Sequence, residues 1–203
     1  MVRLFQEKGG KSKSFFKLIV IVMNQSTQFN IKRKSSFVDE VVLYNGKPLF
    51  SFIDINPTEL CNRTCEFCPR FDPKIYLNQN LHMDIDIAYK IRKELEELNW
   101  NGAINICGNG EPLLHKNIVD LVKAFGDKIK IEITTNGDFL TVDLIKQLYE
   151  SKLNFMVISM YDGPEQVEYF TSLFDESSID KSKYILRDRW YGEDEEYGLI
   201  LTN

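Results

Sequence analysis

The sequence predicts an α/β fold built on a parallel sheet. From Phe50 onward, short apolar runs alternate with helical patterns, which is the arrangement of repeated βα units. Motifs rich in Gly, Asn and Cys directly follow several of the apolar runs. At 203 residues, with 43% hydrophobic and 27% charged residues, the chain is long enough for one domain with a sizeable core.

An Asn-Gly pair precedes the first core strand. Asn45-Gly46 stands between apolar runs and is the strongest short signal of a β-hairpin, with a strand expected near 39–44. The first core strand is predicted over 48–55. Asn56-Pro57 ends it, because proline lacks the amide hydrogen that a strand ladder needs and restricts the residue before it.

The remaining elements alternate along the chain. After a connection over 69–83, Asp84 is placed to cap a helix that runs to Asn99, since apolar residues recur at helical spacing. The pattern then predicts strand 103–107, helix 118–125, strand 129–134, helix 142–150, strand 154–160, helix 164–173, strand 184–188 and strand 199–202. Counting from Phe50, the sheet has six strands, and functional residues of such folds lie at the C-terminal strand ends.

The start of the chain differs from the rest in charge. Residues 1–34 carry eight Lys or Arg and one acid, a net charge of +7, whereas the whole chain carries −5, which leaves −12 for the remainder. We therefore expect a disordered basic leader over 1–36 and a folded domain over 37–203, with a nucleic-acid or membrane-surface arm as the alternative for the leader. The acidic domain itself argues against nucleic-acid binding.

An apolar run lies within the leader. Residues 15–23 are too few to span a bilayer, which takes about 20 residues. The run has the basic flank of a signal peptide, but no small-residue cleavage site follows it, so no membrane span or secretion is expected. A start of translation at Met23 is an open alternative. Clustered thiols without a disulfide framework indicate a reducing, cytoplasmic location.

Three cysteines stand on the short loop after the first core strand. Cys61, Cys65 and Cys68 form a C-x3-C-x2-C pattern, and the other cysteine, Cys107, lies far along the chain. Thiolates at short loop spacings are the usual ligands of iron–sulfur clusters and of zinc. A closed structural site takes four protein ligands, so three thiols predict a metal centre with one position left for a substrate or cofactor.

Polar turns end the later strands. The stretch 107–112, Cys-Gly-Asn-Gly-Glu-Pro, ends the second core strand, and its glycines would let the backbone approach a ligand closely. Thr-Thr-Asn-Gly at 134–137 and Ser-Met-Tyr-Asp-Gly at 159–163 end the next two strands, although Asn-Gly also forms simple turns. Arg187 ends the fifth strand and could instead pair with the acidic run 193–196.

The cysteine pattern together with these strand ends resembles the radical S-adenosylmethionine (SAM) superfamily over about residues 48–203. The resemblance implies a partial (βα)6 TIM-like barrel and an enzyme that reductively cleaves SAM at a [4Fe–4S] cluster to a 5′-deoxyadenosyl radical for hydrogen abstraction. It implies cluster ligation by Cys61, Cys65 and Cys68. It implies SAM contacts by Phe67, Gly108, Gly110, Glu111, Thr134, Asn136, Ser159 and Arg187. The chain departs from the family's Gly-Gly-Glu-Pro motif at Asn109.

The resemblance also implies partners. A flavodoxin- or ferredoxin-type protein would supply the electron. The Arg-Asp-Arg-Trp stretch from Arg187 and the final Leu-Ile-Leu-Thr-Asn are similar to SPASM-type radical SAM proteins, which commonly modify peptides or proteins and continue into a cysteine-rich region. Because the sequence stops at Asn203, we expect a fragment or a separate partner chain. Two rival classes stay open, a zinc-binding module closed by His82 or Cys107 and a catalytically incomplete fold kept as an interaction domain.

Overall fold

The computed structural model of the protein describes residues 31–35, 37, 40–126, 128–189 and 199–200. The chain divides into two compact units, residues 1–36 and residues 37–203. The described part of the first unit, residues 31–35, is helical. The rest of the predicted leader, the acidic run 193–196 and the end of the last predicted strand lie outside the described residues.

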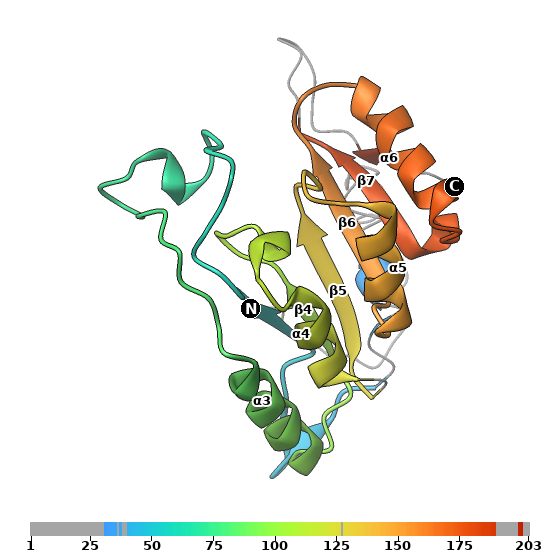
Figure 1. Ribbon diagram of the computed structural model, residues 1–203. Helices are drawn as coiled ribbons and strands as arrows, with labels where there is room; N and C mark the ends of the chain where they lie inside the picture. The colour runs from blue at the N-terminus through green and yellow to red at the C-terminus, as the bar shows by residue number, and fades with distance from the viewer. Residues whose placement is uncertain (1–30, 36, 38–39, 127, 190–198, 201–203) are drawn as a thin grey trace, which may run out of the picture. The chain divides into compact units, whose positions relative to one another are not determined.

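Six strands of the second unit form one sheet in chain order. They are β3 (Phe52–Ile55), β4 (Ala103–Ile106), β5 (Lys130–Thr135), β6 (Phe155–Met160), β7 (Tyr184–Asp188) and β8 (Leu199–Ile200). Every neighbouring pair from β3 to β7 is parallel. The predicted α/β fold with the parallel sheet of a partial TIM-like barrel is confirmed by these five strands (Figure 1).

The last strand differs from the prediction of an all-parallel sheet. β8 pairs antiparallel with β7, with Leu186 opposite Ile200 and Arg187 opposite Leu199. A parallel connection needs about a dozen or more residues to cross back over the sheet. Residues 189–198 are too few for such a crossover, so the chain returns as an antiparallel edge.

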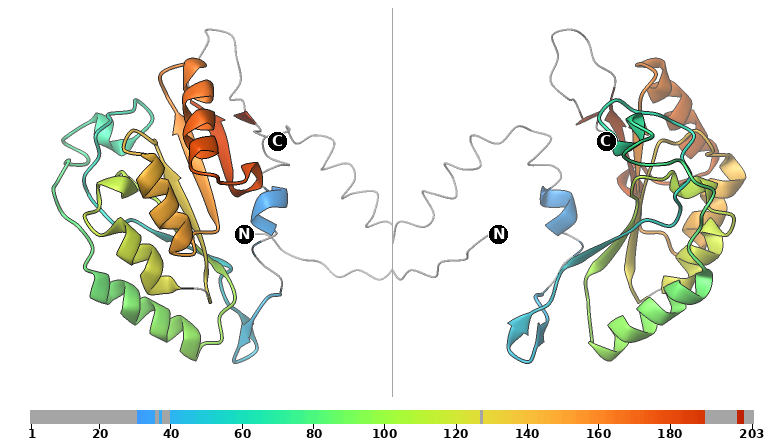
Figure 2. Two further views of the ribbon diagram at one scale, coloured as in Figure 1. Left: turned by 45° about the vertical axis from the view of Figure 1, so that its right-hand side comes forward. Right: turned by 90° about the vertical axis from the view of Figure 1, so that its left-hand side faces the viewer.

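Four helices cover one face of this sheet (Figure 2). They are α3 (Ile85–Glu97), α4 (Ile118–Phe125), α5 (Val142–Glu150) and α6 (Glu165–Glu176). The predicted cap is confirmed, because the Asp84 carboxylate accepts a hydrogen bond from the backbone N–H of Asp86. In the part of the chain that the structure describes, no helix has the length and apolarity needed to cross a membrane.

The core lies between the sheet and these helices. The strand residues that face the helices are fully or nearly fully buried and apolar, among them Ile104, Ile106, Ile131, Ile133, Met156, Ile158 and Leu186. Successive side chains of a strand point to opposite faces. The alternate positions therefore place polar residues on the face away from the helices, and these include Asp54, Asn105, Glu132, Thr134, Ser159 and Arg187.

The predicted hairpin is confirmed ahead of the sheet. β1 (Leu43–Tyr44) pairs antiparallel with β2 (Lys47–Pro48). Asn45 and Gly46 both have positive φ, 51° and 75°, as a two-residue hairpin turn requires. The first core strand begins at Phe52 and not at residue 48, because residues 47–48 pair within the hairpin.

The packing of α6 on the sheet gives a stability prediction. Phe174 is fully buried, and its ring stacks on that of Tyr184 with centroids 3.8 Å apart. Phe174→Ala should lower the free energy of unfolding by about 3–5 kcal/mol in urea denaturation, because it leaves a cavity. Tyr169→Ala on the same helix, where the side chain is 55% exposed, should cost about 1 kcal/mol or less. Equal losses would contradict this packing.

Candidate functional site

The loop of residues 56–68 that carries the three cysteines, hereafter the cysteine loop, lies at the C-terminal ends of the parallel strands (Figure 1). One cavity there is lined by residues of this loop and of the ends of β4, β5 and β6. The lining residues are Cys61, Arg63, Cys65, Phe67, Cys68, Cys107, Gly108, Asn109, Gly110, Glu111, Thr134, Thr135, Asn136, Ser159 and Tyr161. The structure thus gathers every predicted site residue except Arg187 around one cavity.

The two glycines after β4 are required by close contact with the cysteine loop. A Cβ on Gly110 would lie 1.8 Å from the backbone oxygen of Thr58, which no side chain can tolerate. Gly108 has a φ of 140°, and a Cβ there would lie 2.4 Å from Oδ1 of Asn56. The turn after β4 can therefore pack directly against the start of the cysteine loop. The sequence predicts that these glycines let the backbone come close to a ligand. In the structure, the backbone at both glycines comes close to residues of the cysteine loop.

Glu111 joins the ends of β4 and β5. Its carboxylate is 2% exposed and accepts three hydrogen bonds, from the N–H of Leu113 at 3.0 Å, the hydroxyl of Thr135 at 2.5 Å and the N–H of Asn136 at 2.8 Å. Burial raises the pKa of this carboxyl group, and the hydrogen bonds oppose that shift. The side chain therefore fixes the two strand ends relative to each other.

Thr134 and Asn136 are also engaged by neighbouring side chains. The hydroxyl of Thr134 donates to Oδ1 of Asn105 at 3.2 Å, and Asn105 in turn donates to Asp54 at 3.0 Å. The amide nitrogen of Asn136 donates to Oδ1 of Asn62 in the cysteine loop at 2.8 Å. These bonds link β3, β4 and β5 to one another and the end of β5 to the cysteine loop.

Phe67 pairs with Tyr161, which was not among the predicted site residues. Its ring is stacked on Tyr161, with centroids 6.2 Å apart and an interplanar angle of 19°. Phe67 remains 53% exposed, so its ring is available to a ligand. Burial raises the pKa of Tyr161 to about 12. The position of Tyr161 directly after β6 was the signal that could have identified it.

Arg63 lies within the cysteine pattern and lines the cavity, but it was not among the predicted site residues. Its guanidinium contacts Asp138 after β5 through Nε and Nη2, both at 2.6 Å, and Asp162 after β6 through Nη1 at 2.7 Å and Nη2 at 2.5 Å. Its carbon Cζ lies 5.2 Å from the centroid of the Tyr161 ring. A charged residue between two metal-ligand candidates, with acids just past two strand ends, was the available signal.

Arg70 is the second arginine that the sequence did not reveal. It lies in the short 3₁₀ helix η1 (Pro69–Phe71) and is 5% exposed. Its guanidinium donates to the backbone oxygens of Glu59 and Asn109, and at 3.1 Å to that of Leu77. One buried cation therefore binds the cysteine loop, the turn after β4 and the connection toward α3.

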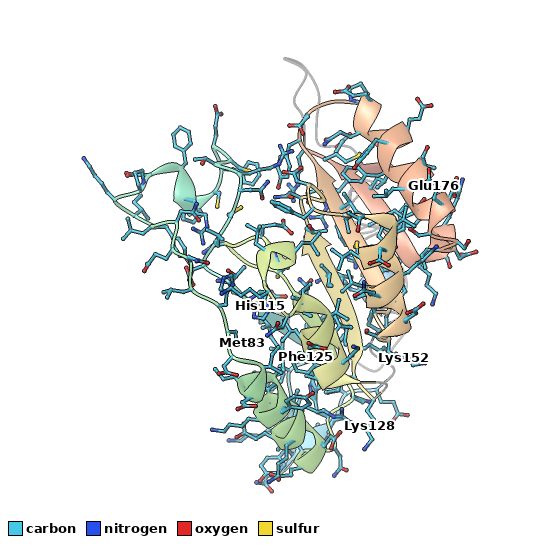
Figure 3. All side chains as sticks on the ribbon, in the orientation of Figure 1. Met83, His115, Phe125, Lys128, Lys152 and Glu176 are labelled. Carbon is cyan, nitrogen blue, oxygen red and sulfur yellow. The ribbon has the colours of Figure 1, made fainter. Side chains whose placement is uncertain are left out.

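Both histidines contact neighbouring protein groups. Nε2 of His115 lies 2.8 Å from the backbone oxygen of Met83, and Figure 3 labels both residues, one before α3 and the other before α4. His82 packs edge-on against His115, with ring centroids 5.5 Å apart, and its Nε2 lies 2.8 Å from Oδ1 of Asn80. His82 is not among the residues that line the cavity, whereas Cys107 is.

Arg187 lies beside the cavity, not in its lining. It is opposite Ser159 in the β6–β7 register and half-buried. Burial and the nearby charge of Arg189 lower its pKa. Among the described residues, no hydrogen bond or ion pair of its guanidinium is found, and the acidic run 193–196 lies outside them.

The donor chemistry of the cavity fits an iron–sulfur cluster. Three thiols from one loop line a single cavity, and burial raises the pKa of the Cys61 and Cys65 thiols, so metal binding would displace their protons. Within the described ranges, no three His, Cys, Asp or Glu residues converge on a position for a single metal ion.

Comparisons with known proteins identify the family of the chain. The family model of the radical SAM superfamily matches residues 55–179. The S-adenosyl-L-methionine-dependent 2-deoxy-scyllo-inosamine dehydrogenase of Niallia circulans is 30% identical over 144 residues, which is 69% of this chain and 56% of that protein. The GTP 3′,8-cyclase of Clostridium perfringens strain SM101 is 31% identical over 112 residues, which is 54% of this chain and 34% of that protein.

A solved structure shows the same fold. The crystal structure of BtrN in complex with AdoMet and 2-DOIA superposes with a TM-score of 0.59 at 26% identity, covering 70% of this chain and 57% of that chain. This chain thus spans only about half the length of BtrN, and 56% and 34% of the two curated relatives.

The hydrogen bonds of Glu111 give a prediction for the site. Glu111→Gln replaces one acceptor oxygen by an NH₂ group that must face a donor, so the free energy of unfolding should fall by about 1–3 kcal/mol. Urea denaturation of the iron-free chain measures this. Glu97→Gln is the matched control, because its side chain is 65% exposed on α3 and should change stability little. Unchanged stability of the Glu111 variant would show that its carboxylate does not hold the strand ends.

Proposed function

Because this chain belongs to the radical SAM superfamily, we propose that Cys61, Cys65 and Cys68 hold a [4Fe–4S] cluster in the cavity at the strand ends. Enzymes of this family use such a cluster together with SAM, and this chain is one of them. When bound, the cluster and SAM supply the electron transfer and the 5′-deoxyadenosyl radical that abstracts hydrogen from a substrate. The chain's own residues bind, orient and shield these groups.

The observation that carries this proposal is the gathering of three thiols and three strand ends around one cavity. A single zinc ion binds thiolates at about 2.3 Å, so its sulfur ligands lie within about 4.6 Å of one another. In the described part of the chain no three potential ligands form such a group, and His82 is not in the cavity lining. The match to the radical SAM superfamily favours a cluster over the zinc-binding module, whose other possible closing ligand, Cys107, lines the same cavity.

The SAM contacts are proposed from the free faces of the cavity. Phe67 offers an exposed ring for the adenine. The turn over Gly108 and Gly110 offers backbone groups for the amino acid part of SAM, and Glu111 fixes that turn. Thr134, Asn136 and Ser159 form the polar wall beside the ribose.

For the substrate we propose a small polar molecule in preference to the peptide or protein suggested by the sequence. The face of the sheet away from the helices carries the hydrogen-bonded row Asp54, Asn105 and Thr134, ending beneath the cavity. The names of the two curated relatives also refer to small polar substrates. A flavodoxin- or ferredoxin-type reductant in a reducing, cytoplasmic environment would supply the electron.

Cysteine variants test the proposed cluster. Anaerobic reconstitution with iron and sulfide should give about four irons per chain, a [4Fe–4S]⁺ EPR signal that shifts with SAM, and 5′-deoxyadenosine after reduction. Cys65→Ala should lose the signal and the product, because two thiols cannot retain the cluster.

Cys107→Ala is the matched control for this experiment. Cys107 lines the same cavity but lies outside the cysteine loop, so its variant should retain iron, EPR signal and SAM cleavage. A colourless protein with one zinc, or a Cys107 variant that loses the cluster while Cys65→Ala keeps it, would contradict the ligand assignment. A cluster that binds SAM without cleaving it would support the catalytically incomplete fold instead.

We also propose that Arg187 pairs with the SAM carboxylate. Its guanidinium is half-buried beside Ser159, and a fork of N–H donors suits a carboxylate. Arg187→Gln should raise the dissociation constant of SAM by about 10- to 100-fold in equilibrium titration of the reconstituted protein. Decarboxylated SAM is the control and should bind both proteins equally. An equal loss for both ligands would assign Arg187 to another role.

A further inference from the structure

We propose that Arg63 is a positioning residue that fastens the cysteine loop to the ends of β5 and β6 through Asp138 and Asp162. The attachment of the loop by Arg63 is inferred from geometry alone. Its expected effect on cluster retention rests on the proposed function. Two bidentate ion pairs, with all four N···O distances between 2.5 and 2.7 Å, meet on one guanidinium. Such forks are the strongest class of side-chain hydrogen bond.

The position of Arg63 makes this fork a constraint on the metal ligands. The residue stands between Cys61 and Cys65, so its backbone belongs to the segment that must present the thiols. Asp138 lies three residues past β5, and Asp162 lies two residues past β6. The fork therefore ties the loop that follows the first strand of the sheet to its third and fourth strands.

Two further contacts extend the fastening. Asn62, the neighbour of Arg63, donates to Oδ2 of Asp138 at 2.6 Å and accepts from Nδ2 of Asn136 at 2.8 Å. On the other side, Arg63 lies over the ring of Tyr161, which stacks on Phe67. Loosening the fork would therefore disturb both the thiols and the ring proposed for adenine.

The same geometry argues against Arg63 as a direct partner of a bound anion. A guanidinium has five N–H donors, and four of those of Arg63 are already used by the two carboxylates. Removing Arg63 would also leave two carboxylates facing each other without a cation. Their repulsion would separate the loops after β5 and β6.

The two carboxylates should contribute unequally. The side chain of Asp138 is 23% exposed and that of Asp162 is 54% exposed, so solvent screens the second pair more strongly. Asp138 also accepts from Asn62, whereas Asp162 accepts from Gln166 within its own turn. Neutralising Asp138 should therefore loosen the cysteine loop more than neutralising Asp162.

Hydrogen–deuterium exchange of the full iron-free chain tests the cause. In Arg63→Gln, the amides of Cys61 and Cys68, which donate hydrogen bonds of 2.9 Å, should exchange about tenfold faster or more, with Asp138→Asn next and Asp162→Asn least. The double variant Arg63→Gln/Asp138→Asn should exchange no faster than Arg63→Gln, because the shared interaction is already lost. Arg63→Lys should also loosen the loop, since one ammonium cannot form both forks.

Arg92→Gln is the matched control. Arg92 pairs with Glu96 at 2.9 Å on α3, its side chain is 27% exposed against 20% for Arg63, and it does not line the cavity. Its removal should leave exchange over 61–68 unchanged. Wild-type protection in both Arg63→Gln and Arg63→Lys would overturn the proposal.

Iron content and SAM affinity after anaerobic reconstitution test the consequence. Arg63→Gln should retain a few-fold less iron than the wild type in proportion to its faster loop exchange. Lower iron or weaker SAM binding with unchanged exchange would overturn the positioning role and make Arg63 a direct contact of the bound groups. A wild-type chain that binds no cluster would refute the proposed function, while the exchange data would still decide whether the fork holds the loop.

Discussion

The buried guanidinium of Arg70 is the contact on which the candidate site depends most. The cysteine loop and the connection after it have almost no strand or helix ladder to satisfy their backbone groups. Arg70 supplies donors to carbonyls of Glu59, Leu77 and Asn109, which belong to three separate segments. Without it, these part-buried carbonyls would lose a charged hydrogen-bond donor. The loop can therefore be irregular and still have one defined path.

Polar side chains also fix the irregular segments on the other sides of the cavity. Asn78 exchanges two hydrogen bonds of 2.9 Å with the backbone of Cys61, which fixes the first thiol-bearing residue. Glu111 joins the ends of β4 and β5, and Arg63 meets acids beyond β5 and β6. The sheet supplies a rigid edge, and polar side chains attach the loop to it. Apolar packing holds the helices to the sheet but does not determine the shape of the cavity.

The fold and the metal-ligand candidates were predictable because both are local patterns. Apolar periodicity gave β3 to β7 and their helices within a few residues, and C-x3-C-x2-C with glycine-rich strand ends gave most of the cavity lining. Arg63 and Arg70 were not predictable in the same way, because their partners are distant in sequence and only the folded sheet brings them together. The antiparallel direction of β8 was not predicted, because the pattern of apolar residues indicates a strand but not its direction.

The distribution of satisfied groups indicates where ligands would act. Glu111, Asp138 and Arg63 are held by hydrogen bonds to neighbouring side chains and backbone groups, so they shape the cavity more than they contact its contents. The ring of Phe67, the thiols of the cysteine loop and the polar groups of Thr134, Asn136 and Ser159 face the cavity, with Arg187 beside it. A site that first satisfies its own polar groups and leaves thiols and an aromatic face for its cofactors is organised before they bind. Such a site needs little rearrangement on binding, which conserves affinity.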